Sequence, residues 1–185
     1  MPAAGATVLL LTGSPGCGKT TVAPLVADRY EPSACLDLDW FFAKVQRGRI
    51  EPWLPEAHAQ NRLVLRAGAE AVAAFAGGGY FTVAEGILYP MMLDLFAEAC
   101  APHGIELHYA VLRAPVGVVR QRVRQRRTEP EHAGALADAD VVDDLWDQFE
   151  RHGVAERHRV DSDDRTPAAI AEEIDRRLGA GQFRL

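Results

Sequence analysis

The residues best suited to chemistry follow the first apolar segment of the chain. They read Gly13-Ser14-Pro15-Gly16-Cys17-Gly18-Lys19-Thr20-Thr21 and match the spacing G-x-x-x-x-G-K-[ST]. Glycines let the backbone curl so that successive N–H groups face an anion, and a helix that begins there adds its positive end. This segment, called the phosphate loop below, therefore predicts a site for the phosphate groups of a nucleotide.

Two side chains of the phosphate loop have a predicted chemical role. Lys19 is expected to carry its charge to the β- and γ-phosphates, and the Thr20 hydroxyl to ligate Mg²⁺. Cys17 is expected to contribute only its backbone N–H. Guanine-specific proteins carry an N-K-x-D sequence, whereas the single asparagine here, Asn61, is followed by arginine. ATP is therefore the expected nucleotide.

Two acidic residues, Asp37 and Asp39, stand at the end of the second apolar segment, 34–38. Asp37 and Asp39 project to the same side of a strand, at the carboxyl end where open α/β sheets bind their ligands. Asp39 is predicted to accept the proton of an attacking hydroxyl; the alternative is that it only caps a helix that starts at Trp40. Asp37 is predicted to support the metal or to contact Lys19.

Glu85 and Gly86 follow the third apolar segment. An acid at this place is expected on the metal side of the site, and Glu85 is predicted to contact Mg²⁺, either directly or through water, or to bind the substrate. Gly86 has no side chain and is predicted to let a substrate approach the backbone.

Five arginines lie on the helical pattern Val116–Arg127. Val116, Val119 and Val123 mark its buried stripe; Arg126 continues that stripe and Arg122 flanks it. Guanidinium groups facing a cleft suit phosphates, so both are predicted to bind the nucleotide, with Arg126 also catalytic. The polar segment 128–137 follows, and a lid over the nucleotide is expected at about 120–137.

The region of about 40–66 is expected to face the phosphoryl acceptor. Trp40, Phe42 and Arg62 are its predicted substrate-binding residues, together with Asp39, Glu85 and Gly86. The aromatic residues favour an acceptor with an apolar or ring-containing body, and the alternative is that they belong to the core. No compact basic cluster of the kind that marks a carboxylate- or phosphate-bearing acceptor is present in this region.

Apolar runs and helical spacing alternate along the chain, which favours a parallel sheet covered on both faces. The expected strands are Thr7–Thr12, Ala34–Leu38, Tyr80–Ala84, Glu106–Leu112 and Arg157–Val160. The expected helices are Gly18–Tyr30, Trp40–Arg47, Glu56–Ala76, Pro90–Ala101, Val116–Arg127, Asp138–His152 and Pro167–Leu178. Pro24 is expected to kink or loosen the first helix, because it removes a hydrogen bond.

Composition narrows the class of protein. The chain has 185 residues, which suits one domain over 1–185, and a net charge of −6, which argues against a broad nucleic-acid-binding face. No apolar run reaches the length of a membrane span, and no signal peptide is recognised. The three cysteines show no metal or disulfide spacing, so a reduced, cytoplasmic protein is expected.

With these motifs in order, the chain resembles the small P-loop kinases of the nucleoside-monophosphate-kinase-like group. It looks most like the chloramphenicol phosphotransferase-like branch, with shikimate and gluconate kinases as cousins. The resemblance implies a three-layer α/β P-loop NTPase fold with a five-stranded parallel sheet in the order 2-3-1-4-5. It also implies Asp39 as general base and Arg126 as a phosphate-binding lid residue. Shikimate kinases carry a glycine triplet after the third strand, whereas Gly77–Gly79 precedes it here, which argues against shikimate as acceptor.

The sequence thus predicts a kinase that uses ATP and Mg²⁺ to phosphorylate a hydroxyl of a small molecule, with an antibiotic-like or other ring-containing metabolite as a candidate acceptor. Two alternatives stay open. One is a kinase of a nucleotide or of a nucleic-acid end, and the other is a nucleotide-binding module without transfer activity. The identity of the acceptor and the oligomeric state are not predicted.

Overall fold

The structure, a computed structural model, describes residues 6–126 and 138–185. Its strands form one sheet in the order β2-β3-β1-β4-β5, and every neighbouring pair is parallel. They are β1 (Thr7–Gly13), β2 (Ser33–Asp37), β3 (Phe81–Glu85), β4 (Glu106–Arg113) and β5 (Arg159–Asp161). The predicted parallel sheet and its strand order are confirmed.

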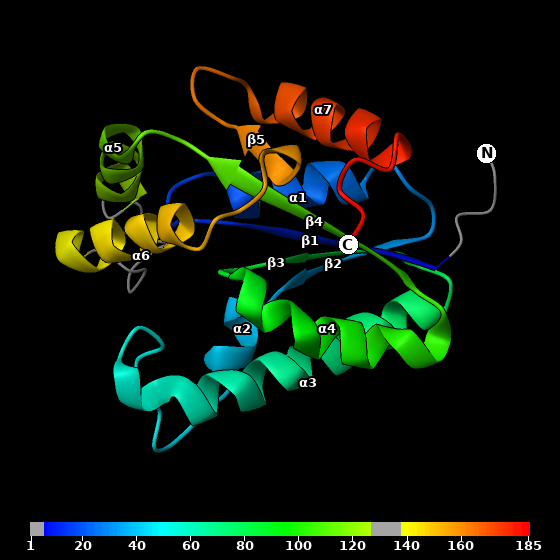
Figure 1. Cartoon of the computed structure of the whole chain (residues 1–185), viewed down its shortest axis with the longest axis horizontal. Helices are drawn as coiled ribbons and strands as arrows, with labels where there is room; N and C mark the ends of the chain where they lie inside the picture. The colour runs from blue at the N-terminus through cyan, green and yellow to red at the C-terminus, as the bar shows by residue number, and fades with distance from the viewer. Residues whose placement is uncertain (1–5, 127–137) are drawn as a thin grey trace.

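Helices cover both faces of this sheet (Figure 1). The α-helices are α1 (Lys19–Ala27), α2 (Asp39–Phe42), α3 (His58–Gly77), α4 (Leu93–Cys100), α5 (Val116–Arg126), α6 (Ala139–Arg151) and α7 (Pro167–Gly179). Short 3₁₀ turns are η1 (Pro55–Ala57), η2 (Pro90–Met92), η3 (Ala101–His103) and η5 (Glu156–His158). No helix among the described residues combines the length and hydrophobicity needed to cross a bilayer.

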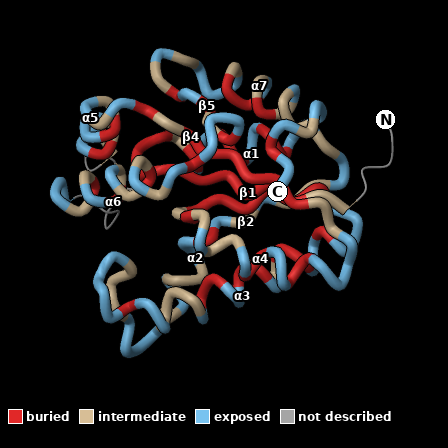
Figure 2. The backbone as a smooth tube through the Cα atoms, viewed as in Figure 1, coloured by how far each residue is buried: buried red, intermediate tan, exposed pale blue. Residues whose placement is uncertain are grey.

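The central strand β1 builds both halves of the core. Its side chains alternate between the two faces, as in any strand. Val8 and Leu10 pack with α3 and α4, whereas Leu9 and Leu11 pack with α1 and α7. Figure 2 shows the resulting buried layer between exposed helix surfaces. A strand buried on both faces reads as an unbroken apolar run, which explains why the sequence pattern located it.

Three elements differ from the sequence-based expectation. Helix α1 continues through Pro24, which stays on the solvent side, and the Asp28 N–H bonds the Pro24 carbonyl at 2.8 Å. Helix α2 ends at Phe42 instead of Arg47, because i→i−3 bonds tighten the chain into turns after it. Strand β5 begins at Arg159 because the two preceding residues belong to the turn η5.

The C-terminal residues complete the sheet. Strand β5 pairs only with the last part of β4. The first part of β4 is covered by the chain end instead, where Tyr109 donates its N–H to Phe183 O at 2.9 Å and Leu185 to Leu107 O at 3.0 Å. Phe183 is fully buried between this edge and α7. The tail therefore shields backbone groups that would otherwise form an open sheet edge.

Candidate active site

The phosphate loop runs from the end of β1 to the start of α1. Two of its glycines are required because neighbouring backbone leaves no room for a side chain. Gly13 and Gly16 have φ of +144° and +79°, which side chains rarely adopt. A Cβ on Gly13 would lie 2.3 Å from the Leu112 carbonyl oxygen, and one on Gly16 2.9 Å from that of Val119. Gly18, at φ +100°, turns the chain into α1 with no neighbour nearby. The loop is therefore wedged between β1, β4 and α5.

Lys19 is the charged centre of the loop. Its ammonium Nζ donates to Gly13 O at 2.9 Å and to Ser14 O at 3.2 Å, and the residue is only 7% exposed. These bonds hold the charge over the concave side of the loop before a ligand arrives. The geometry agrees with the predicted role of Lys19 toward phosphate groups.

The other residues of the loop divide into buried and accessible ones. Ser14 and Cys17 are buried, Pro15 is half-buried, and Thr20 and Thr21 are exposed. Burial raises the pKa of the Cys17 thiol above its ordinary value, against the opposing effect of Lys19. Because Cys17 packs inside the core, its thiol is inert, and only its backbone belongs to the site.

Three carboxylates lie close together at the carboxyl ends of β2 and β3, and two of them, Asp39 and Glu85, lie close to Lys19. Asp37 lies opposite Glu85 in the parallel register, and Glu85 lies opposite Leu11 of β1. The Leu38 N–H also donates to Glu85 O at 2.9 Å, which carries the pairing one residue past β2. Asp39 begins α2 directly after it. The sheet register thus gathers acids that lie 48 positions apart in the sequence (37 and 85).

Asp37 and Asp39 have different local surroundings. The Asp37 carboxylate accepts the Asp39 N–H at 2.8 Å, so Asp37 provides the capping bond at the start of α2. Asp39 is the first residue of α2, and Leu38 before it occupies the N-cap position. The capping role considered for Asp39 from the sequence therefore falls to Asp37.

The surroundings raise the pKa of two of these acids. Burial raises the pKa of Glu85 to about 7; Lys19 and a hydrogen bond with the Thr20 side chain oppose the rise, while Asp37 and Asp39 add to it. Asp39 is accessible to solvent, yet the protein on its other sides withdraws it from water and raises its pKa, against the effect of Lys19. Carboxyls with raised pKa values in a cleft are typical of functional sites.

The same residues fit a magnesium ion of the kind that accompanies nucleotides. Among the described residues, no three His, Cys, Asp or Glu side chains form an enclosed metal site. Mg²⁺ rarely needs one, because it binds one or two carboxylates, waters and substrate phosphates. The Thr20 hydroxyl beside the Glu85 carboxylate, with Asp37 adjacent, supplies such an open, oxygen-rich set.

A network of hydrogen bonds fixes the loop after β3 and with it Glu85. The Leu88 N–H donates to the Thr12 hydroxyl at 2.8 Å, and Leu88 O accepts from Thr12 at 3.2 Å and from the Tyr109 hydroxyl at 2.8 Å. Gly86 is buried here, and a Cβ on it would lie 3.0 Å from the Leu38 Cβ. Gly86 therefore packs closely against Leu38, just after β2. That Gly86 lets a substrate approach the backbone stays a prediction.

The arginines of α5 separate into two groups. Arg122 and Arg126 line a cleft of about 400 Å³ with Gly16, Gly18, Thr20 and Thr21 of the phosphate loop. Arg122 donates to Ser162 O at 2.8 Å, which fixes its guanidinium at the edge of the cleft. Arg120 instead pairs with Asp143 of α6 on the surface. The expected lid, about 120–137, falls in part on residues 127–137, which lie outside the described residues.

Sequence reasoning missed the opposite wall of this cleft. Ser162 and Arg165 of the β5–α7 connection and Pro167 at the start of α7 line it, and Gln125 of α5 lines the cleft beside Arg122 and Arg126. Arg165 donates to Glu173 at 2.5 Å and to the Ala169 carbonyl at 3.1 Å, so it is held in place. The position of Arg165 beyond the carboxyl end of β5, just before a helix start, was the available signal.

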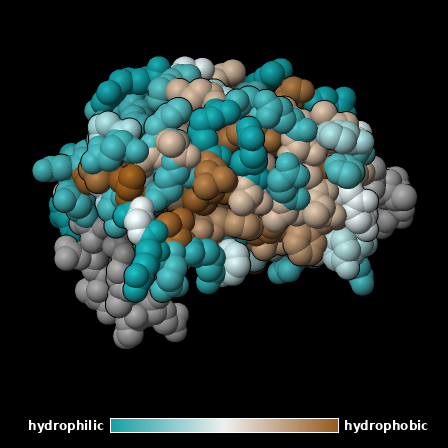
Figure 3. Space-filling model, turned by 90° about the horizontal axis from the view of Figure 1, so that it is seen from below, coloured by the Kyte–Doolittle hydropathy of each residue, from teal (hydrophilic) through white to brown (hydrophobic). Residues whose placement is uncertain are grey.

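The expected acceptor-side residues do not form one compact group. Trp40 is 53% exposed and carries the Lys44 ammonium 4.2 Å from its ring centroid. Phe42 packs partly against the core. Arg62 donates to Asp94 of α4 at 3.2 Å, which directs it to the α3–α4 surface. In the view of the molecule from below (Figure 3), hydrophobic residues form a band across the middle of the surface, and hydrophilic residues surround it.

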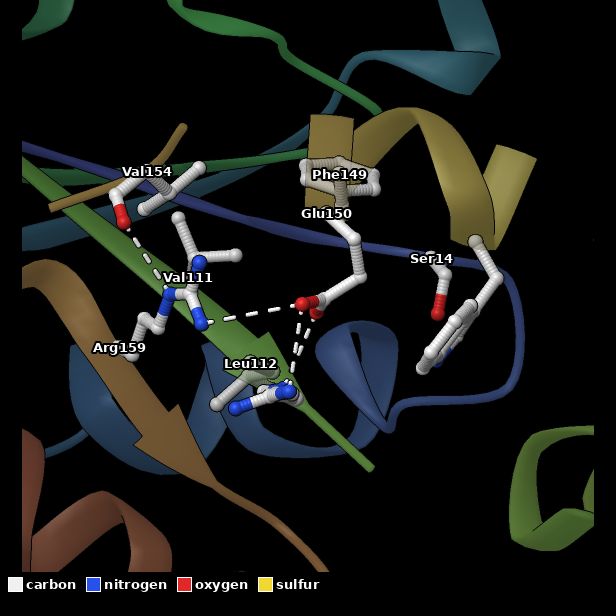
Figure 4. Close-up of a pocket in the computed structure, with 9 residues that line it drawn as sticks. Ser14, Val111, Leu112, Phe149, Glu150, Val154 and Arg159 are labelled. Carbon is white, nitrogen blue, oxygen red and sulfur yellow. Dashed lines mark hydrogen bonds and ion pairs between the residues drawn. The ribbon is translucent and has the colours of Figure 1, made fainter. Parts of the chain in front are cut away.

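A second, much smaller cavity lies on the other side of Ser14, toward α6. Figure 4 shows Glu150 facing Arg159 across it, with Phe149 and Ser14 nearby. Glu150 holds Arg113 at 3.1 Å and Arg159 at 3.8 Å. The cavity measures about 20 Å³, room for one water molecule. The cavity is therefore too small to bind a substrate.

The phosphate loop follows the central strand β1, and acidic residues stand at the ends of β2 and β3. This arrangement defines a P-loop protein with the sheet topology of P-loop kinases. Residues 8–152 match the AAA_33 family, described as an AAA domain, and the chain belongs to this family. The predicted resemblance to the small P-loop kinases is thereby confirmed. The comparison with curated proteins found no match.

Solved kinases share the fold. A sugar kinase from Janibacter sp. HTCC2649 is 22% identical, with 93% of this chain and 94% of that chain covered and a TM-score of 0.69. The shikimate kinase from Acinetobacter baumannii is 19% identical, with 94% and 93% covered and a TM-score of 0.58. A tunicamycin resistance protein from Deinococcus radiodurans is 14% identical, with 93% and 95% covered and a TM-score of 0.61.

Proposed function

We propose that this protein transfers the γ-phosphoryl group of ATP to a hydroxyl group of a small molecule. The observation that carries the proposal is the meeting of Lys19, Asp39 and Glu85 at the open end of the phosphate loop. A cation for the phosphates lies there beside a base for the acceptor. Family membership and the kinase fold of the solved neighbours support it.

The nucleotide binds along the phosphate loop. Backbone N–H groups and the positive end of α1 hold the phosphate oxygens, as at other helix N-termini. Lys19 leaves its carbonyl partners and contacts the β- and γ-phosphates. The cleft of about 400 Å³ takes the rest of the nucleotide, with Arg126 toward its phosphates. Arg165 and Pro167 form the wall against which the nucleoside lies.

Thr20 and Glu85 would hold Mg²⁺, with Asp37 opposite Glu85 in the sheet register. When bound, the ion would supply positive charge that stabilises the negative charge growing on the phosphates during transfer. The raised pKa of Glu85 fits this role, since the buried carboxylate needs a cation to become charged. In the absence of a ligand, Lys19 and the Thr20 side chain partly stabilise the charged form of Glu85.

Asp39 accepts the proton of the acceptor hydroxyl. The oxygen forms a bond to the γ-phosphorus as the bond from that phosphorus to the β–γ bridging oxygen breaks, and ADP leaves. The proton moves to the Asp39 carboxylate. A raised pKa makes this carboxylate a stronger base than a fully hydrated aspartate, and its accessibility lets an acceptor reach it.

The direct test is transfer of label from γ-labelled ATP to a panel of alcohols and to an extract of small metabolites. The wild-type protein is expected to label at least one organic product, and the Lys19→Ala variant none, with its fold intact by circular dichroism. Label that appears only as inorganic phosphate, at the same rate with and without alcohols, would contradict the proposal.

A further inference from the structure

The charges around the candidate acceptor site are unevenly distributed. Cationic side chains line the nucleotide side of the molecule, where Arg122, Arg126 and Arg165 border the cleft. Asp39 and Glu85 lie close to Lys19, and Asp37 lies close to both of these carboxylates. Of the three, Asp37 and Asp39 are exposed. An acceptor that enters beside Asp39 therefore meets negative groups first.

The cations of the region 40–66, all of which the structure describes, are engaged elsewhere with one exception. Arg49 pairs with Glu51 at 3.3 Å, Arg62 with Asp94 at 3.2 Å and Arg66 with Glu98 at 3.8 Å. Lys44 lies over the Trp40 ring at 4.2 Å. The exception is Arg47, an exposed residue in the turn after α2.

The segment that carries these residues is held in a fixed arrangement. Gln60 of α3 accepts the Ile50 N–H at 2.9 Å and donates to Ile50 O at 2.6 Å, and Asn61 donates to Pro52 O at 2.7 Å. Figure 1 shows this segment, α2 and the first turns of α3 at the same end of the sheet as the phosphate loop. The backbone of residues 50–52 is thus held against α3, while the paired arginine side chains stay exposed at its surface.

We propose that the acceptor is an alcohol without a carboxylate or phosphate group, and that an ammonium group close to its reacting hydroxyl improves binding. The inference rests on the proposed kinase function and narrows the substrate class of that site. Planar recognition of a carboxylate favours a free, forked guanidinium, and three of the four arginines of this region, Arg49, Arg62 and Arg66, are already paired with Glu51, Asp94 and Glu98. The fourth, Arg47, stands alone and does not form a cluster of cations. Like charges placed together across an interface strongly disfavour binding.

Matched trios of alcohols test this charge preference. Each trio differs in one terminal group, which is a carboxylate, a hydroxymethyl or an aminomethyl group. Gluconate, glucitol and glucamine form an open-chain trio; mandelate, phenylethanediol and 2-amino-1-phenylethanol form a trio with a ring. In any trio that is labelled, kcat/KM is expected to be about 100-fold lower for the carboxylate than for the neutral member. The amine is expected to exceed the neutral member by roughly threefold.

The same panel separates the two proposals. A kcat/KM for the carboxylate member of a trio that equals or exceeds that of the neutral member, or a carboxylate- or phosphate-bearing alcohol as the main product in the metabolite extract, would overturn the charge inference and leave the kinase function standing. No labelled organic product in either the panel or the extract would overturn the kinase function and the inference with it. Label confined to neutral and amine acceptors supports both.

A pair of variants tests the structural cause. Asp94→Asn releases the guanidinium of Arg62, and Glu98→Gln, its matched control, releases that of Arg66, one turn farther along α3. Asp94→Asn is expected to raise the carboxylate-to-neutral ratio of kcat/KM by about tenfold, and Glu98→Gln to leave it unchanged. An unchanged ratio in Asp94→Asn would show that pairing of Arg62 is not what excludes anionic acceptors.

Discussion

Replacing Glu85 by Gln is expected to stabilise the ligand-free protein at pH 8 and to have a much smaller effect at pH 5. Glu85 is 4% exposed and stands beside Asp37 and Asp39, so its charged form is costly in the folded chain. Glutamine keeps the shape and one oxygen of the side chain but cannot ionise. The variant therefore removes the charge penalty alone.

The size of the expected change in the free energy of unfolding follows from the pKa of Glu85. The ordinary value of 4.5 in the unfolded chain rises to about 7 in the fold. Between these values the folded protein holds more protons than the unfolded one, so its stability falls as pH rises. With one pKa unit worth about 1.4 kcal/mol, the penalty is about 1 kcal/mol at pH 5 and about 3 kcal/mol at pH 8. Glu85→Gln should recover these amounts.

Urea denaturation of wild type and Glu85→Gln at both pH values measures the difference in free energy of unfolding. Glu106→Gln is the control of opposite sign. Hydrogen bonds from Arg184 and His108 lower the pKa of Glu106, so its charge stabilises the fold, and its replacement should cost stability at pH 8. A Glu85→Gln variant that is less stable than wild type at pH 8, or equally shifted at both pH values, would refute this view of the site.

Three further outcomes are expected. Gly13→Ala places a Cβ 2.3 Å from a carbonyl oxygen of β4, so it should abolish ATP binding by calorimetry and cost about 1–3 kcal/mol; unchanged ATP affinity would show that the loop relaxes. Phe183→Ala, at a fully buried site, should cost about 3–5 kcal/mol by urea denaturation, while Leu185→Ala, at a 52% exposed site, should cost far less. Equal losses would argue against docking of the tail. The buried Cys17 thiol should react with a disulfide reagent only in denaturant; rapid reaction in the native protein would mean that the loop opens.

The elements that the sequence predicted well are those that local pattern determines. Strand β1 is an apolar run buried on both faces, and the phosphate loop is defined by its own glycines and Lys19. The strand order came from the resemblance, and the sheet confirmed it. Asp37 and Glu85 lie at the same edge of the sheet because their strands are parallel, and a βαβ pattern in the sequence already implies parallel strands.

The features that the sequence did not predict depend on contacts between residues that are far apart in the chain. Helix α2 is short because the chain turns after Phe42 and the side chain of Gln60 then holds Ile50. Arg62 is directed by Asp94, 32 residues away. Thr12 fixes the loop after β3 through Leu88, 76 residues away. None of these pairs has a local signature, because each forms only when the helices and strands have packed.

The most direct test of the central claim is the rate of γ-phosphoryl transfer by Asp39→Asn, measured under single-turnover conditions at saturating ATP and an acceptor found with wild type. The replacement keeps the size of the side chain and removes its ability to accept a proton as a base. Transfer is expected to fall by about 10²–10⁴-fold, with the Kd for ATP unchanged. Transfer at the wild-type rate would contradict the assignment of Asp39 as the base and, with it, this account of the site.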